Sequence, residues 1–190
     1  KISDNFHIFS PFPENDWVFI HPYKCLGINF SYEDIYLPVH YNNKIWEKIK
    51  RCKFILIHPG SGGEAKRWDL ENYFFLENYF NSKGYEVFYL LGETERNLLR
   101  LFESKNIFYN SSLTDIIFLL QYAKGFIGGD SGPGHLAGLI GVSGLLLFGP
   151  SDVNIFKPYK NLNVVKVSDN VNDVKPIYII KIWEEVIEKR

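Results

Sequence analysis

The chain has no methionine, not even at its first position, which is Lys1. Because translation starts at methionine, we expect the 190 residues to be a piece of a longer protein. Cysteine is also scarce. Cys25 and Cys52 are too few for a disulfide framework, so we expect two reduced thiols of the kind found in the cytosol.

An excess of charge of either sign is missing too. The chain has 21 Lys and Arg residues against 22 Asp and Glu residues, which gives a formal net charge of −1. No basic field favours nucleic acid as a partner, and no polybasic run favours a membrane surface. No apolar run reaches the roughly 18–20 residues that span a bilayer, and no signal peptide is visible. These features favour a cytoplasmic protein.

Residues 129–133 read Gly-Asp-Ser-Gly-Pro, which resembles the sequence around a serine-protease nucleophile. A nucleophile elbow is missing, because Pro133 occupies the last position of G-x-S-x-G. His135 follows Ser131 by only four residues, and in a tight loop this spacing does not by itself align an imidazole on the hydroxyl. We therefore predict that Ser131 is not a nucleophile.

Two nucleotide-binding motifs are incomplete. The Walker A pattern is missing, because Lys66 does not follow a glycine. Residues 60–65 match the looser dinucleotide fingerprint G-x-G-x-x-A, whose helix must begin inside the glycines. Here the predicted helix cap is Asp69, and the acid after the second predicted strand, Glu93 or Glu95, comes about thirty residues on rather than about twenty. The spacing argues against NAD.

A regular alternation of apolar strands and helices is present from residue 54 onward. It predicts an α/β fold, a doubly wound parallel sheet of the Rossmann-like kind, over residues 54–190. Residues 1–53 lack a clear period, apart from a short amphipathic helix within 42–52, and are expected to be a linker or the remnant of a preceding domain. The predicted strands are 54–59, 85–92, 107–110, 126–129, 143–149 and 163–167, and the predicted helices are 69–84, 93–106, 112–125, 133–141 and one that starts at Pro176.

Two glycine-rich loops follow predicted strands and so lie at the edge where doubly wound sheets bind ligands. The glycines of residues 60–63 let backbone N–H groups approach an anion, and Lys66 and Arg67 add positive charge. Residues 130–135 run into a predicted helix whose first N–H groups and dipole attract negative charge, with Pro133 suited to its first turn. Two such loops suit a diphosphate.

Asp130 does not suit a phosphate, because its carboxylate would repel the anion. It suits the hydroxyls of a sugar, whose hydrogen bonds it accepts, or it caps the helix that follows. A simpler interpretation stays open, in which Asp130 and Ser131 only cap a helix and Lys66 is a solvated charge. The shared edge of the two loops favours the ligand-binding interpretation.

Three segments of the chain point to a family: HPGSGGEAKRWDLENY, LLGETER and SSLTDIIFLLQYAKGFIGGDSGPGHLAGLIGVSGLLLFGPSD. Through them the chain resembles, over about residues 54–160, the carboxyl-terminal domain of glycosyltransferase family 9, the ADP-heptose:lipopolysaccharide heptosyltransferases and their relatives. The resemblance implies a GT-B fold of two Rossmann-like domains, of which this chain is the carboxyl-terminal half and holds the nucleotide sugar.

The resemblance also implies donor-binding roles for particular residues. Ser61 and Gly62 match the positions that meet the phosphates, and Lys66 matches the lysine that neutralises the diphosphate leaving group. Glu95 matches the acid near the ribose, and Ser111 falls where the adenine lies. Gly63 is also expected to bind the donor, and the residues that match the loop around the donor's sugar and diphosphate are Asp130, Ser131, Gly132 and His135.

The chemistry implied by the resemblance is an inverting, metal-independent transfer of a sugar from an ADP-activated donor to lipopolysaccharide or another glycan acceptor. It implies no cofactor beyond the ADP-sugar and no metal, and no D-x-D motif occurs in the chain. The acceptor loop, the acidic base and any peripheral contact with a membrane would belong to an amino-terminal domain that residues 1–53 do not resemble. Two alternatives stay open: a stand-alone nucleotide-binding module, and another GT-B enzyme such as a nucleotide-sugar 2-epimerase.

Two glycines depart from the family pattern. Gly134 stands where the family commonly has Met or a similar residue, and Gly138 replaces an alanine usual in the helix that follows. Both lower the helix propensity of this segment. The departures leave the choice of donor sugar open.

Overall fold

A computed structural model describes residues 17–18, 20–27, 37, 39–159 and 162–189. Contacts divide the chain into two units. The smaller unit holds the described residues before residue 37 together with Asp152–Lys157, and the larger unit holds Leu37–Ser151 and Pro158–Arg190. The division therefore lies earlier than the boundary expected at residue 53, and residues 39–53 belong with the larger unit.

The smaller unit contains two short helices, α1 (His21–Cys25) and α6 (Val153–Phe156). Two hydrogen bonds join its segments. The Val18 amide donates to the Ile155 carbonyl at 2.9 Å, and the indole N–H of Trp17 donates to the Lys157 carbonyl at 2.8 Å.

The larger unit is built on a six-stranded parallel sheet in the order β3-β2-β1-β4-β5-β6. The strand order reverses between β1 and β4, which are neighbours in the sheet although two strands separate them in the chain. The doubly wound parallel sheet expected from the sequence is confirmed. Its strands are β1 (Phe54–His58), β2 (Glu86–Leu91), β3 (Asn106–Tyr109), β4 (Gly125–Gly129), β5 (Gly144–Leu147) and β6 (Leu162–Val165).

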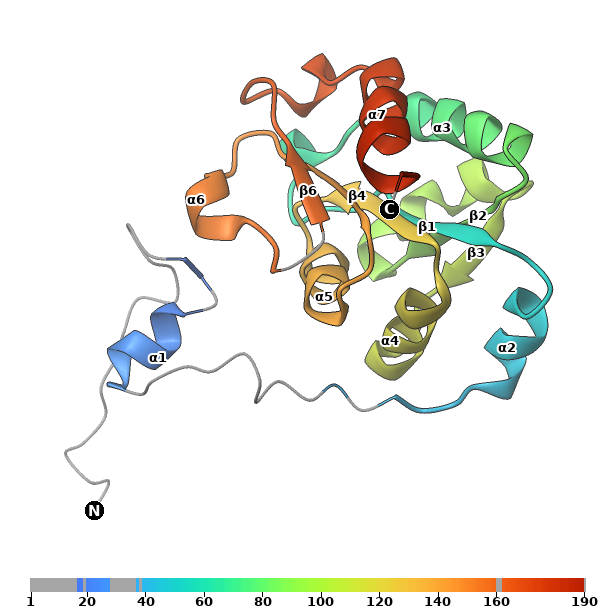
Figure 1. Cartoon of the computed structure of the whole chain (residues 1–190), viewed down its shortest axis with the longest axis horizontal. Coiled ribbons are helices and arrows are strands. Elements are labelled where there is room, and N and C mark those ends of the chain that lie inside the picture. Colours follow the sequence, from blue (N-terminus) through green and yellow to red (C-terminus); the bar gives the residue numbers. More distant parts are fainter. Residues whose placement is uncertain (1–16, 19, 28–36, 38, 160–161, 190) are drawn as a thin grey trace. The chain divides into compact units, whose positions relative to one another are not determined.

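Helices cover both faces of this sheet (Figure 1), with α3 and α7 on one face and α4 and α5 on the other. Alternate strand residues supply the two cores, because successive side chains of a strand point to opposite faces. Ile55 and Tyr89 pack in the core cluster with Trp183 of η5, whereas the rings of Phe54 and Phe88 pack edge to face at 5.4 Å between centroids. The helices of the larger unit are α2 (Asn43–Ile49), η2 (Glu64–Lys66), α3 (Leu70–Ser82), η3 (Glu93–Phe102), α4 (Leu113–Tyr122), α5 (Gly132–Ile140), η4 (Val171–Asp173), α7 (Pro176–Ile182) and η5 (Trp183–Ile187).

The ends of these helices follow their local chemistry. Gly84 adopts a left-handed φ of 81° after α3, the conformation in which glycine commonly ends a helix. Asp69 precedes α3, but its side chain makes no capping hydrogen bond, in contrast to the expectation. Its amide instead donates to Asn172 Oδ1 at 2.8 Å, which ties the start of α3 to η4.

Two predicted α-helices take other forms. Residues 93–106 form the 3₁₀ helix η3 over Glu93–Phe102, where the Glu95 carboxylate turns back to accept from the Gly92 amide. The last helix begins at Pro176, as expected, but its second half is the π-helix η5. None of the helices within the described ranges is long and apolar enough to cross a membrane.

Candidate functional site

The site forms where the chain leaves β1 and β4 at the carboxyl edge of the sheet. The loop after β1 leads into η2, and the loop after β4 leads into α5. Because β1 and β4 are adjacent, the two loops meet, and the Ser61 hydroxyl donates to the Asp130 carbonyl at 3.2 Å. This is the switch point at which doubly wound sheets place ligands.

Asp130 is the centre of the polar contacts at this point, although it is only 8% exposed. Its Oδ2 accepts from Lys66 Nζ at 2.8 Å and from the Ser151 hydroxyl at 2.5 Å. Its Oδ1 lies 3.4 Å from Nε2 of His135. Burial alone would raise the pKa of Asp130, but the hydrogen bonds from His135, Lys66 and Ser151 and the charge of Lys66 hold it well below its ordinary value.

Lys66 reaches Asp130 from η2, and its side chain remains 34% exposed. Lys66 is thus paired with a carboxylate in the structure, and its role toward a diphosphate stays a prediction. Because the ammonium is both held by a buried carboxylate and open to the edge of the sheet, it lies where an anionic ligand can meet it.

Ser131 is the N-cap of α5. Its hydroxyl accepts from the Gly134 amide at 3.4 Å and donates to the Gly129 carbonyl at 3.2 Å. Pro133 lies in the first turn of the helix, as expected. The hydroxyl of Ser131 thus has the environment of a helix cap, whereas the imidazole of His135 faces Asp130.

Three glycines leave open space at this edge. A Cβ added to Gly62, Gly63 or Gly132 would meet no atom within 4 Å. Gly134 differs, because a Cβ there would lie 2.9 Å from the side chain of Leu146. Gly134 and Gly138 are both buried in α5, so the two departures from the family pattern face the protein rather than the open edge.

Glu95 lies beneath the first loop and is only 1% exposed. Its carboxylate accepts from the Gly92 amide at 2.9 Å and from the Thr94 hydroxyl at 2.6 Å, and it lies 3.9 Å from Nη2 of Arg67. A Cβ on Gly60 would lie 2.4 Å from Oε1. Glu95 is therefore at the expected edge of the sheet but turned inward in this structure.

His58 is a buried neighbour that the sequence analysis did not single out. Its Nδ1 lies 2.8 Å from the Leu90 carbonyl, and its ring adjoins Gly60. Burial lowers the pKa of His58, although the Leu90 carbonyl and the charge of Glu95 act in the opposite direction. The sequence did contain a signal for His58, because it is the one polar residue of the apolar strand β1 and stands at its carboxyl end.

Ser111 follows β3 at the same edge and is partly buried. The cap of α4 is its neighbour Ser112, whose hydroxyl accepts from the Asp115 amide at 3.2 Å. Next to these residues, a pocket of about 300 Å³ lies between the first turn of α4 and the length of α5. Its wall is apolar and includes Leu113 and Pro133, so the pocket suits a flat apolar group.

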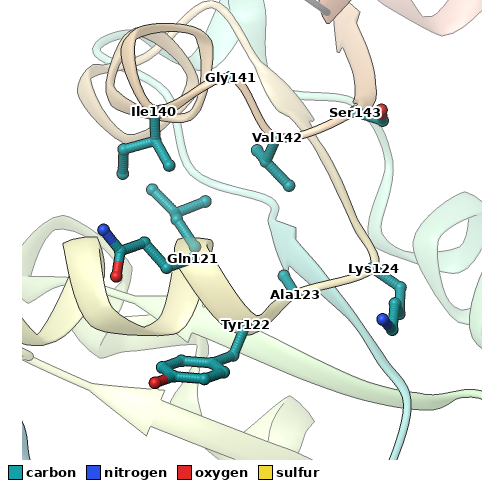
Figure 2. Close-up of a pocket in the computed structure, with 9 residues that line it drawn as sticks. Gln121, Tyr122, Ala123, Lys124, Ile140, Gly141, Val142 and Ser143 are labelled. Atoms are coloured by element: carbon teal, nitrogen blue, oxygen red, sulfur yellow. The ribbon is translucent and has the colours of Figure 1, made fainter.

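A second pocket, of about 620 Å³, lies at the opposite edge of the sheet (Figure 2). The segments 120–124 and 140–143 line it, and they precede β4 and β5. Because ligands of doubly wound folds bind at the carboxyl ends of the strands, this pocket is not the candidate site. The described residues contain no cluster of three or more His, Cys, Asp or Glu side chains that could hold a metal ion.

Several glycosyltransferases are similar to the chain in sequence or in fold. The chain is 26% identical to lipopolysaccharide heptosyltransferase 3 of Escherichia coli K12 over 151 residues, which is 70% of the chain and 43% of that protein. A glycosyl transferase family 9 structure from Veillonella parvula superimposes with a TM-score of 0.77 at 17% identity, over 91% of the chain and 59% of that structure. An E. coli heptosyltransferase solved with ADP gives a TM-score of 0.64 at 19% identity, over 72% and 45%.

The chain thus spans less than half the length of the curated heptosyltransferase and about three fifths of the Veillonella structure. The solved structures support the fold, and the sequence supports the family. The sequence profile of glycosyltransferase family 9 (heptosyltransferase) matches residues 31–176, most of the chain. The chain therefore belongs to glycosyltransferase family 9.

Proposed function

We propose that this chain binds the donor of a glycosyltransferase, an ADP-activated sugar such as ADP-heptose, whose sugar is transferred to a lipopolysaccharide-type acceptor. The observation that carries the proposal is the Lys66–Asp130 ion pair between two anion-receptive loops at the switch point of the sheet. The heptosyltransferase name of the E. coli relative and the ADP in the solved neighbour support the same donor class.

The two charges of the pair suit two parts of a nucleotide sugar. The ammonium of Lys66, the open backbone of Gly62 and Gly63 and the N-terminus of α5 attract the diphosphate. Asp130 is ionised and accepts hydrogen bonds, so it suits sugar hydroxyls rather than phosphate oxygens. A donor with its diphosphate at Lys66 and its sugar toward Asp130 satisfies both residues.

We propose that the nucleoside of the donor binds at the same edge, in the apolar pocket between α4 and α5. The apolar pocket between α4 and α5 begins at Leu113, two residues after Ser111, and includes Gly132 of the second loop. An adenine in this pocket would bury its flat faces against Leu113 and Pro133. A diphosphate attached to it would then extend over the second loop.

The arrangement favours departure of the nucleoside diphosphate. Negative charge grows on the leaving diphosphate as the bond to the sugar breaks, and a fixed cation and helix dipole stabilise that charge. Lys66 and the start of α5 supply both, so we propose a metal-independent transfer. That the transfer inverts the anomeric centre is a proposal that rests on the family resemblance alone. None of the described residues is assigned as the base that deprotonates the acceptor hydroxyl.

Calorimetric titration of the chain with ADP, AMP and NAD tests the proposal. We expect ADP to bind and NAD to bind weakly or not at all. Lys66→Ala should weaken ADP binding about tenfold to a hundredfold, because a charge-assisted contact contributes about 1.5–3 kcal/mol, and should weaken AMP binding less.

Lys83→Ala is the matched control. Lys83 also forms an ion pair with an acid, Glu184 at 3.4 Å, but it follows α3 and is 44% exposed. We expect its ADP affinity to equal that of the wild type. Tight NAD binding without a response to ADP would contradict the proposal, and so would equal small losses for ADP and AMP in Lys66→Ala.

A further inference from the structure

The two carboxylate oxygens of Asp130 have different contacts. Oδ1 faces His135, whereas Oδ2 accepts from both Lys66 and Ser151. Ser151 lies in the loop that follows β5, the strand next to the one that leads to Asp130. It is 7% exposed, so its hydroxyl contacts Asp130 in the buried part of the site.

A diphosphate bound at Lys66 would compete with Asp130 for its ammonium. If the ammonium turned toward the new anion, its contact with Oδ2 would weaken. A buried carboxylate left without a donor is costly, and this cost would be subtracted from the affinity for the ligand. A Ser151 hydroxyl that remained at Oδ2 would limit that cost.

Ser151 is itself held independently of Lys66. Its backbone carbonyl accepts from Lys166 Nζ at 3.1 Å, and the same ammonium lies 2.9 Å from Asp169 Oδ1. Both residues follow β6. The segment that follows β6 thus holds the backbone of Ser151, the serine that contacts the Asp130 carboxylate.

We infer that Ser151 is a positioning residue of the donor site, which fixes the Asp130 carboxylate so that Lys66 can engage a diphosphate. The inference rests on the proposed donor-binding function. It adds to the site a residue from the loop that follows β5, beyond the two loops that follow β1 and β4.

Titration of four forms of the full chain with ADP and AMP tests the inference. The forms are the wild type, Ser151→Ala, Ser151→Thr and the control Ser143→Ala, which changes a serine at the opposite end of β5. Ser151→Ala should weaken ADP binding about tenfold, as expected for the loss of a hydrogen bond to a charged group, and should leave AMP binding nearly unchanged. Ser151→Thr, which keeps the hydroxyl, and Ser143→Ala should behave like the wild type.

A second measurement does not need the ligand. The pKa of Asp130, followed by carbon NMR of its carboxyl group, should rise in Ser151→Ala and return in Ser151→Thr. If the wild type fails to bind ADP, the proposed function fails, and this titration alone decides whether Ser151 positions the carboxylate. Should Ser151→Ala not fold, Ser151→Cys, whose thiol is a weak donor, takes its place.

Three results would overturn the inference. One is an ADP affinity of Ser151→Ala equal to that of the wild type. Another is an equal loss for ADP and AMP that Ser151→Thr does not restore, which indicates a merely structural role. The third is an unchanged pKa of Asp130 in Ser151→Ala.

Discussion

At the scale of single residues, Gly60 shows how tightly the buried layer beneath the first loop is packed. A Cβ there would lie 2.4 Å from Oε1 of Glu95 and 2.7 Å from Cε1 of His58. Both neighbours are held by other hydrogen bonds, Glu95 by the Gly92 amide and His58 by the Leu90 carbonyl. Neither can move without losing a partner, so the position requires glycine.

Gly60→Ala should therefore lower the free energy of unfolding by about 1–3 kcal/mol, the usual effect of overpacking. Gly62→Ala is the matched control two residues away, because a Cβ there meets no atom within 4 Å. Its free energy of unfolding should stay within about 0.5 kcal/mol of the wild type. Urea denaturation of the three proteins checks this, and equal stability of the two variants would contradict the packing argument.

The sequence analysis located these residues better than it identified their contacts. It placed the loops of Gly62 and Asp130 at one edge because each loop follows an apolar strand. It considered Lys66 only as a diphosphate ligand or as a solvated charge, whereas the structure pairs it with Asp130. That pair joins residues 64 positions apart in the chain, and so does not follow from local pattern. Ser151 was missed for the same reason.

At the scale of elements, strands were easier to predict than helices. All six strands were located, and three of them, β1, β4 and β5, are buried along their whole length, as strands covered by helices on both faces are. The type of a helix depends on contacts that the sequence pattern does not contain. In η3 the inward turn of Glu95 accompanies a 3₁₀ helix, and after Ile182 the last helix widens into a π-helix.

The helix α2 tests where the larger unit begins. Although it lies in the segment expected to be a linker or remnant, it packs on α4, with Trp46 and Tyr122 rings 5.2 Å apart and the Asn42 amide donating to Asp115 at 2.6 Å. Ile49, at its end, is 3% exposed. These contacts resemble those of a core helix more than those of a linker.

Ile49→Ala should therefore lower the free energy of unfolding of the larger unit by about 2–4 kcal/mol. Lys44→Ala, at an exposed position on the same helix, should change it by no more than about 0.5 kcal/mol. Thermal and urea unfolding, followed by tryptophan fluorescence, measure both variants. Wild-type stability of Ile49→Ala would show that α2 is not part of the cooperative unit.

At the scale of the whole molecule, the stability of the larger unit depends on two buried groups that hold fixed protonation states. Burial lowers the pKa of His58, so the folded protein keeps this imidazole neutral. Asp130 is kept ionised, because the hydrogen bonds from His135, Lys66 and Ser151 outweigh the effect of burial. In both cases the unfolded chain binds a proton more readily than the folded protein, so acid favours unfolding.

The two groups act in different pH windows, which their ordinary values in an unfolded chain define. His58 should begin to reduce the free energy of unfolding as the pH falls below about 6.5, and Asp130 as it falls below about 4. His58→Asn, whose amide can still donate to the Leu90 carbonyl, should remove the loss in the first window only. Asp130→Asn should reduce the loss in the second window only, because Asp115, whose pKa is also lowered, contributes there as well. Urea denaturation from pH 8 to pH 3 measures both slopes, and a His58→Asn protein that loses stability between pH 7 and pH 5 as steeply as the wild type would show that another group titrates there.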